Sequence, residues 1–224
     1  MGEQIKILVV DDHHLVVEGI RSSLSQYPEY DITTTNTCDD AFYKLKEASA
    51  NPYQILFTDL SFEDQPENTQ IDGGEALIKA IREAEIPVKI GVITGHTETN
   101  RVFNVITNLN PDAYILKSKC TGEELHFAIQ KLLKDEQFYT HEIHHKILKR
   151  NIIQIQMDEV AIQILKELPM HSKITNLEGR IKKADGSTLK IRSIENKLAN
   201  LRIDLNAKNN TDLVLKAKEL GIID

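Results

Sequence analysis

The residue types most able to do chemistry stand where short apolar, strand-like runs end. They are Asp11 and Asp12 after residues 5–10, Asp59 after 55–58, Thr94 at the end of 88–94, and Lys117 directly after 113–116. In an open parallel sheet the carboxyl ends of the strands share one edge, and ligands bind there. The spacing therefore predicts three carboxylates, one hydroxyl and one ammonium group at a single edge.

Such a group of side chains suits phosphoryl transfer. Crowded carboxylates repel one another unless a cation joins them, and hard oxygen ligands that also face phosphate favour Mg²⁺. A carboxylate can act as the nucleophile and become an aspartyl-phosphate. The Lys117 ammonium and the Thr94 hydroxyl would then stabilise the phosphoryl oxygens. Taken singly, each residue has an ordinary structural explanation, such as a helix cap for a strand-terminal Asp.

The elements that must position these side chains alternate along the first part of the chain. Strand patterns at 5–10, 32–35, 55–58, 88–94 and 113–116 are each followed by a helical pattern, at 14–25, 39–48, 74–84, 98–109 and 122–133. Five such units predict a five-stranded parallel sheet with helices on both faces.

The pattern changes after residue 134. Residues 135–156 are polar and contain His141, His144 and His145, whose spacing could hold a metal, although a solvated linker, partly helical, is the better interpretation. Helical patterns follow at 157–168, 174–181, 193–205 and 212–220, and residues 184–187 form a strong turn signal. We therefore predict a second, all-α domain at 157–224.

Charge and composition agree with two domains that have different partners. Residues 1–150 carry a net charge of −9 and residues 151–224 a net charge of +2. No run of 18 apolar residues and no signal peptide is present, so we expect a cytoplasmic protein that does not span a membrane. Cys38 and Cys120 are expected to be reduced thiols.

Several motifs resemble those of the NarL/FixJ (LuxR-type) response regulators of two-component systems. They are residues 9–20 (VVDDHHLVVEGI), Thr58-Asp59-Leu60, Ile93-Thr94-Gly95 and residues 113–118 (AYILKS). The resemblance implies a flavodoxin-like, doubly wound (βα)5 receiver at 1–134 that a sensor histidine kinase phosphorylates on Asp59. It also implies Mg²⁺ held by Asp11 or Asp12, by Asp59 and by the backbone carbonyl of Ser61, with Thr94 and Tyr114 as the switch pair.

One segment departs from the family pattern. Asp72-Gly73 normally follows the phosphorylated Asp closely, but here a long acidic loop, residues 61–71, comes between them. Long loops beside a site often act as lids or contact partners. This loop could alter the choice of kinase or the dephosphorylation rate, or it could be a tolerated surface insertion.

The region from Ser193 to Ile222 is similar to the LuxR-type helix-turn-helix. Apolar residues at helical spacing in 193–205 would face inward, which leaves a polar face able to contact bases and phosphates. The candidate DNA-binding residues are Lys190, Arg192, Asn196, Lys197, Asn200 and Arg202, and Lys182 and Lys183 could add phosphate contacts. Two departures are a longer turn at 180–192 and the acidic Glu195 and Asp204.

These observations favour a phosphorylation-gated transcriptional regulator, not an enzyme, that forms a homodimer when phosphorylated and binds promoter DNA. The first alternative is a signalling adaptor whose altered helical domain binds a protein. The second is a metal-dependent hydrolase on the same carboxylates, for which His96 is the nearest candidate base.

Overall fold

The computed structural model describes residues 4–63 and 68–223, which fall into two compact units. The first comprises residues 1–97 and 104–143 and the second comprises 98–103 and 144–224, within those described ranges. The middle of the long loop predicted at 61–71, residues 64–67, lies outside the described residues.

The first unit is built on one parallel sheet. Its strands within the described residues are β1 (Ile5–Val10), β2 (Tyr30–Thr35), β3 (Ile55–Thr58), β4 (Lys89–Thr94), β5 (Ala113–Leu116) and β6 (Phe138–Tyr139). They are hydrogen bonded in the order β2-β1-β3-β4-β5-β6, and every pair is parallel. The order reverses beside β1, and this is the point at which an open sheet of this kind places its site.

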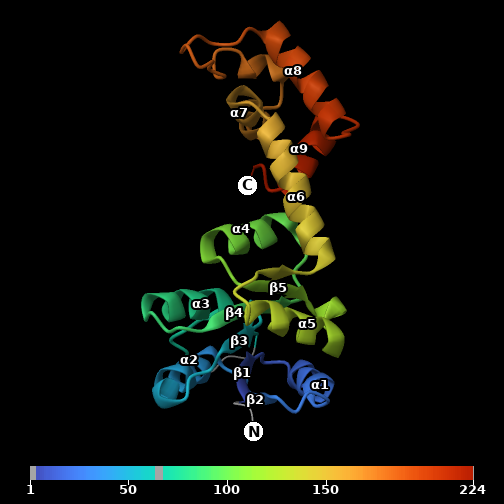
Figure 1. The fold of residues 1–224 in the computed structure, drawn as a ribbon. Helices are drawn as coiled ribbons and strands as arrows, with labels where there is room; N and C mark the ends of the chain where they lie inside the picture. The colour runs from blue at the N-terminus through green and yellow to red at the C-terminus, as the bar shows by residue number, and fades with distance from the viewer. Residues whose placement is uncertain (1–3, 64–67, 224) are drawn as a thin grey trace. The chain divides into compact units, whose positions relative to one another are not determined.

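Helices cover both faces of the sheet (Figure 1). They are α1 (His14–Leu24), α2 (Cys38–Glu47), α3 (Gly73–Glu83) and α5 (Gly122–Leu132), with short 3-10 turns η1 (Ala48–Ala50) and η2 (Lys117–Lys119). Helix α4 (Thr99–Leu109) begins in the second unit and ends in the first. Successive strand residues point to opposite faces. Ile7 and Val9 accordingly pack with residues of α1 and α5, while α2 and α3 lie together on the other face.

The sheet has one more strand than the sequence predicts. β6 is only two residues long, and Phe138 and Thr140 donate backbone hydrogen bonds to the carbonyls of Asp112 and Tyr114 at 2.9 and 3.1 Å. A two-residue strand carries no detectable period, which explains why the pattern missed it. The segment predicted as a linker continues as a helix, α6 (His141–Gln156).

The second unit is helical. It contains α7 (Glu159–Glu167), the 3-10 turns η3 (Leu168–Met170) and η4 (Ile174–Leu177), α8 (Ile191–Asp204) and α9 (Asn210–Glu219). Asp158 caps α7 by accepting a hydrogen bond from Ala161 N–H, and Pro169 prevents its continuation. Ile194, Leu198 and Leu201 of α8 are buried in a core shared with α7 and α9.

The prediction of a helix at 174–181 is wrong beyond Leu177, where the short 3-10 turn η4 ends. Gly179 adopts a left-handed backbone with φ of 82°, and the chain then turns back on itself in an antiparallel bridge between Lys182 and Thr188. We call residues 181–189 the basic hairpin. The ADGS turn signal marks its tip, so the sequence located the turn but not the hairpin around it.

Within the residues described, no helix combines the length and the apolar character needed to cross a membrane.

Candidate functional site

Asp11 and Asp59 meet at the carboxyl edge because β1 and β3 are neighbours. Val10 is paired with Thr58, so the residue that follows each strand lies at the same level. Asp59 N–H also donates a hydrogen bond to the carbonyl of Val10 at 3.1 Å. Both Asp residues are buried, with 2% and 4% of their surface exposed. Two carboxylates this close require a positive partner.

Lys117 supplies that partner from β5, across the end of β4. Its Nζ atom lies 2.8 Å from Asp11 Oδ2 and 2.8 Å from Asp59 Oδ2. Burial lowers the pKa of Lys117, but the hydrogen bonds that it donates to Asp11 and Asp59 outweigh burial and leave its pKa raised. The ammonium therefore stays charged at neutral pH, and the structure shows the convergence that the strand ends predict.

Backbone around Asp59 fixes the orientation of its carboxylate. Leu60 N–H donates a hydrogen bond to Oδ1 of Asp59 at 2.6 Å, on the oxygen that Lys117 leaves free. The start of α3 packs so closely here that a Cβ on Gly74 would lie 1.8 Å from the Asp59 carbonyl oxygen. Only glycine fits at this position, so Gly74 is part of what positions the site.

Asp12 is used differently from Asp11. Its carboxylate accepts a hydrogen bond from Glu63 N–H at 2.6 Å and lies 2.8 Å from His13 Nδ1. His13 Nδ1 also lies 3.1 Å from Asp11 Oδ1, so the ring bridges the two carboxylates. The charge of Asp12 raises the pKa of His13, against the effect of burial. The sequence analysis missed His13, although a His directly after two Asp residues is a visible signal.

The donor set fits a divalent cation. Asp11, His13 and Asp59 each offer one ligand atom, and these atoms lie within 4.8 Å of one another. Two carboxylates on a shared edge match the hard oxygen ligands that Mg²⁺ prefers. Among the described residues this is the one such group found, and His141, His144 and His145 do not form another.

Thr94 and Tyr114 lie on adjacent strands, and both are completely buried. Residue His96 connects them: its N–H donates a hydrogen bond to the Thr94 hydroxyl at 3.4 Å, and the Tyr114 hydroxyl donates to its carbonyl at 3.5 Å. Thr94 and Tyr114 therefore both contact the backbone of His96, and their role as a switch pair remains a prediction.

Ser61 contacts the site through its side chain. Its Oγ lies 2.7 Å from Nε2 of His96, so the loops after β3 and β4 are joined beside Asp59. Coordination by the Ser61 carbonyl remains a prediction. Nε2 of His96, the candidate base of the hydrolase hypothesis, is in contact with the Ser61 hydroxyl.

The candidate DNA-binding residues separate into two groups on α8. Arg192, Asn196 and Asn200 are exposed, and 3.6 residues per turn place them within about 40° of one line along the helix. Ile203 lies on the same line with 77% of its surface exposed, and the sequence analysis missed it. Glu195 is about 100° from Asn196 and lies on the flank of this face.

Two other candidates on α8, Lys197 and Arg202, are engaged by neighbouring side chains. Lys197 Nζ lies 2.6 Å from Oδ2 of Asp158, which is the residue that caps α7. Arg202 donates a hydrogen bond to the Asn210 side chain at 2.9 Å. Both residues support the packing of α8 in this structure. Lys190 is exposed and directly precedes α8.

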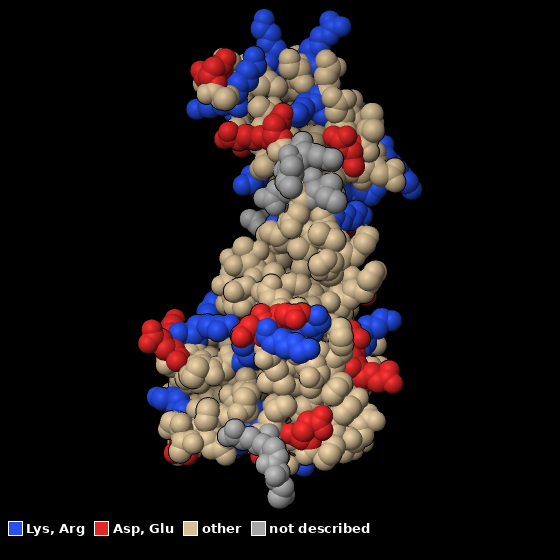
Figure 2. Space-filling view, in the orientation of Figure 1, with Lys and Arg blue, Asp and Glu red and all other residues tan. Residues whose placement is uncertain are grey.

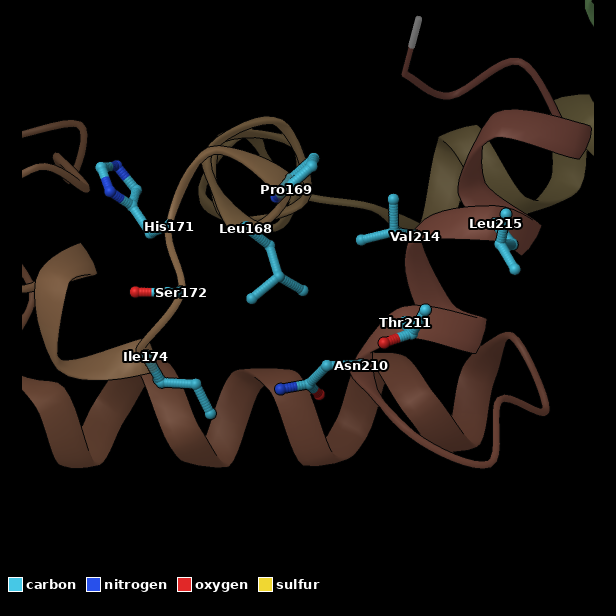
Figure 3. Close-up of a pocket in the computed structure, with 9 residues that line it drawn as sticks. All are labelled: Leu168, Pro169, His171, Ser172, Ile174, Asn210, Thr211, Val214 and Leu215. Carbon is cyan, nitrogen blue, oxygen red and sulfur yellow. The ribbon is translucent and has the colours of Figure 1, made fainter.

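A cavity of about 370 Å³ lies elsewhere in the second unit, between η3 and the first turns of α9 (Figure 3). Its lining is mixed: the apolar members include Leu168, Ile174, Val214 and Leu215, and the polar members are His171, Ser172, Asn210 and Thr211. None of its lining residues is among those that surround Asp59.

Comparison with known proteins agrees with this geometry. Residues 7–130 match the model of the response regulator receiver domain. The chain belongs to this family. The match contains Asp11, Asp59, Thr94 and Lys117, so the whole carboxyl-edge site lies in the receiver. The family consists of signalling regulators, not enzymes.

Relatives extend over nearly the whole chain. The response regulator protein VraR of Staphylococcus saprophyticus is 25% identical over 221 residues, which cover 98% of this chain and 99% of VraR. A structure of the RcsB response regulator of Salmonella typhimurium is 19% identical with a TM-score of 0.64, covering 97% of this chain and 99% of RcsB. A structure of RcsB bound to the rprA promoter in the presence of a phosphomimetic has a TM-score of 0.58 and is 20% identical. The match covers 96% of this chain and 99% of RcsB. These likenesses show a receiver joined to a helical C-terminal domain.

Proposed function

We propose that this chain is a two-component response regulator in which phosphorylation of Asp59 by a sensor histidine kinase controls binding of the C-terminal domain to promoter DNA. The observation that carries the proposal is the contact of Lys117 Nζ with both Asp11 and Asp59 at 2.8 Å. An ammonium in this position can neutralise charge on a transferring phosphoryl group. The proposed domains are a receiver at 1–134, a linker at 135–156 and the output domain at 157–224.

In the proposed reaction a carboxylate oxygen of Asp59 forms a bond to phosphorus while the bond from phosphorus to the donor histidine nitrogen breaks. Leu60 N–H holds one carboxylate oxygen, and Lys117 stabilises the negative charge beside the other. A bound Mg²⁺, held by Asp59 with Asp11 or Asp12 and the Ser61 carbonyl, would supply further charge neutralisation. Thr94 would donate its hydroxyl to a phosphoryl oxygen.

The phosphoryl group adds between one and two negative charges and three acceptor oxygens to the site. Attraction of Thr94 toward it would shift His96, and with it the contact to Tyr114. A buried element with two arrangements is what such a local charge can bias. We propose that this change favours a homodimer, whose two output domains bind paired half-sites in cytoplasmic DNA.

Promoter binding is supported by the RcsB structure, described as bound to a promoter. It is also supported by the exposed face of α8, where Arg192, Asn196 and Asn200 combine the side chains that contact guanine, adenine and phosphate.

One observation favours the adaptor as a second candidate. Lys197 and Arg202 are engaged by Asp158 and Asn210 of the same domain, which leaves α8 with fewer free cations than its sequence suggests. DNA selection from a random pool separates the two candidates. The regulator predicts an enriched motif whose affinity falls with salt, and the adaptor predicts none.

The phosphorylation site itself is tested by incubating the protein with acetyl phosphate, reducing the product with borohydride and mapping the modified residue by mass spectrometry. Modification at Asp59 supports the proposal. Modification at another carboxylate, with Asp59 unchanged, contradicts it.

A further inference from the structure

The basic hairpin, residues 181–189, occupies the segment in which this chain departs from the family pattern. We propose that it contacts DNA phosphates beside the groove that α8 enters, through the ammonium groups of Lys182 and Lys183. This inference rests on the proposed DNA-binding function and adds a second, sequence-independent contact to it.

The hairpin is anchored in the core of its domain. Ile181 and Leu189, at its two ends, are buried, and Leu189 N–H donates a hydrogen bond to the Ile181 carbonyl at 2.9 Å. Lys182 and Thr188 form the antiparallel bridge next to them. An insertion built in this way has a fixed position relative to α8, unlike a solvated loop.

The tip is ordered by its own hydrogen bonds. Oδ1 of Asp185 accepts hydrogen bonds from the N–H and the hydroxyl of Ser187, at 2.9 and 2.6 Å. Gly186 has a φ of 81°, which a side chain would disfavour. Lys183 closes the turn through its N–H to the Ser187 carbonyl at 2.8 Å. The carboxylate of Asp185, the acidic residue at the tip, therefore accepts hydrogen bonds within the turn itself.

Gln163 of α7 holds the first strand of the hairpin. Its side-chain oxygen accepts a hydrogen bond from Lys182 N–H at 2.9 Å, and its amide nitrogen donates to the Lys182 carbonyl at 3.2 Å. Both backbone groups of Lys182 are thus satisfied by one amide. The Lys182 side chain is exposed and takes no part in this contact. Gln163 is a positioning residue for the hairpin.

Positive charge collects along this segment. Residues 178–192 contain five Lys and Arg against two Asp and Glu, a net charge of +3. Of the acidic two, Asp185 serves the turn and Glu178 accepts a hydrogen bond from Ile191 N–H at 3.3 Å. Figure 2 shows Lys and Arg side chains projecting from the end of the second unit where Figure 1 draws the hairpin and the start of α8. Lys182 and Lys183 are exposed, and neither forms an ion pair within the described residues.

Double-stranded DNA is the partner that this arrangement fits best. The hairpin ends at Leu189 and α8 begins at Ile191, so the two lysines belong to the same continuous segment as the exposed face of Arg192, Asn196 and Asn200. Backbone contacts that flank a reading helix fix its register without reading sequence. An acidic protein surface would match the charge alone, but not the adjacent asparagines.

The test is a salt titration of DNA affinity with wild type and K182A/K183A, on the selected operator and on a random duplex. Each lost phosphate contact reduces the slope of log K against log salt by about 0.9, so we expect a decrease of about 2. Affinity should fall by the same factor on both duplexes. The matched control K79A/K134A removes two exposed receiver lysines and should leave the slope unchanged.

Two further variants keep the result interpretable. K182R/K183R retains the charges and should retain the slope, while Q163A keeps both lysines but frees the hairpin and should lose part of the affinity. An unchanged slope in K182A/K183A, or a loss confined to the operator, overturns the inference while the proposed function survives. If the wild-type protein binds neither duplex, the inference and the proposed function both fail.

Discussion

The Nζ atom of Lys117 lies 2.8 Å from Oδ2 of Asp59, although 58 residues separate them in the chain. The same ammonium lies 2.8 Å from Asp11, so one cation is shared by two buried carboxylates. This shared ammonium makes the edge suitable for a phosphoryl group, because an incoming phosphoryl oxygen can take the place of a carboxylate at Lys117. Several consequences of this relationship can be measured.

K117A should slow phosphorylation by acetyl phosphate by about a hundredfold, the usual effect of removing one preorganised electrostatic contact. It should also reduce the free energy of unfolding by about 1–3 kcal/mol, because two buried carboxylates lose their partner. Phosphate-affinity gels and urea denaturation measure the two effects. K119A, which removes an exposed lysine two residues away, is the control. Equal rates for K117A and wild type would refute the assigned role.

Mg²⁺ should stabilise the wild-type protein against heat, by about 2.7 kcal/mol at a concentration of one hundred times its Kd. D11N and D59N each remove a ligand and a charge, so both should lose most of this stabilisation. D31N alters an exposed carboxylate of β2 and should respond as wild type does. Scanning calorimetry of each variant with Mg²⁺ and with EDTA measures this stabilisation. An equal stabilisation of D59N and wild type by Mg²⁺ would place the metal elsewhere.

T94A should be phosphorylated but should not convert phosphorylation into tighter DNA binding, because the hydroxyl that contacts His96 N–H is missing. T94S restores the hydroxyl and should restore the response. Y114F removes only the hydroxyl that reaches the His96 carbonyl, so it avoids the cavity that Y114A would create in the core. DNA affinity measured with and without acetyl phosphate separates the variants. A full response in T94A would show that the signal takes another route.

Both thiols should react slowly in the folded protein. Burial raises the pKa of Cys38 and of Cys120 to about 12, so the thiolate fraction at pH 8 is about one in ten thousand. The rate of alkylation by iodoacetamide should rise about tenfold per pH unit between pH 7 and pH 9 and stay far below that of the urea-unfolded chain. Labelling of the native protein at the unfolded rate would show that the thiols are accessible.

The carboxyl-edge site could be predicted from sequence because its signals are local. The apolar runs before Asp11, Asp59 and Lys117 each identify a strand end, and parallel pairing brings those ends together without further information. His13 was missed because its position depends on the turn after β1, where its N–H bonds to Asp11 at 2.9 Å. A side-chain position set by one hydrogen bond leaves no periodic signal.

The output domain was harder to predict for a similar reason. Residues 174–181 have helical spacing, but the burial of Ile181 against Leu189 favours a hairpin over a longer helix. That tertiary contact overrides local propensity. The ion pair of Lys197 with Asp158 also joins residues 39 positions apart, so the helical pattern alone could not separate Lys197 from the exposed residues of α8.

The central claim is that a phosphoryl group on Asp59 governs DNA binding, and one titration tests it most directly. The affinity of wild type and D59N for the selected operator is measured at fixed salt, with and without acetyl phosphate and Mg²⁺. We predict that the treatment strengthens binding by wild type at least tenfold and leaves D59N unchanged. Equal affinities for treated and untreated wild type, or an equal gain in D59N, would contradict the account.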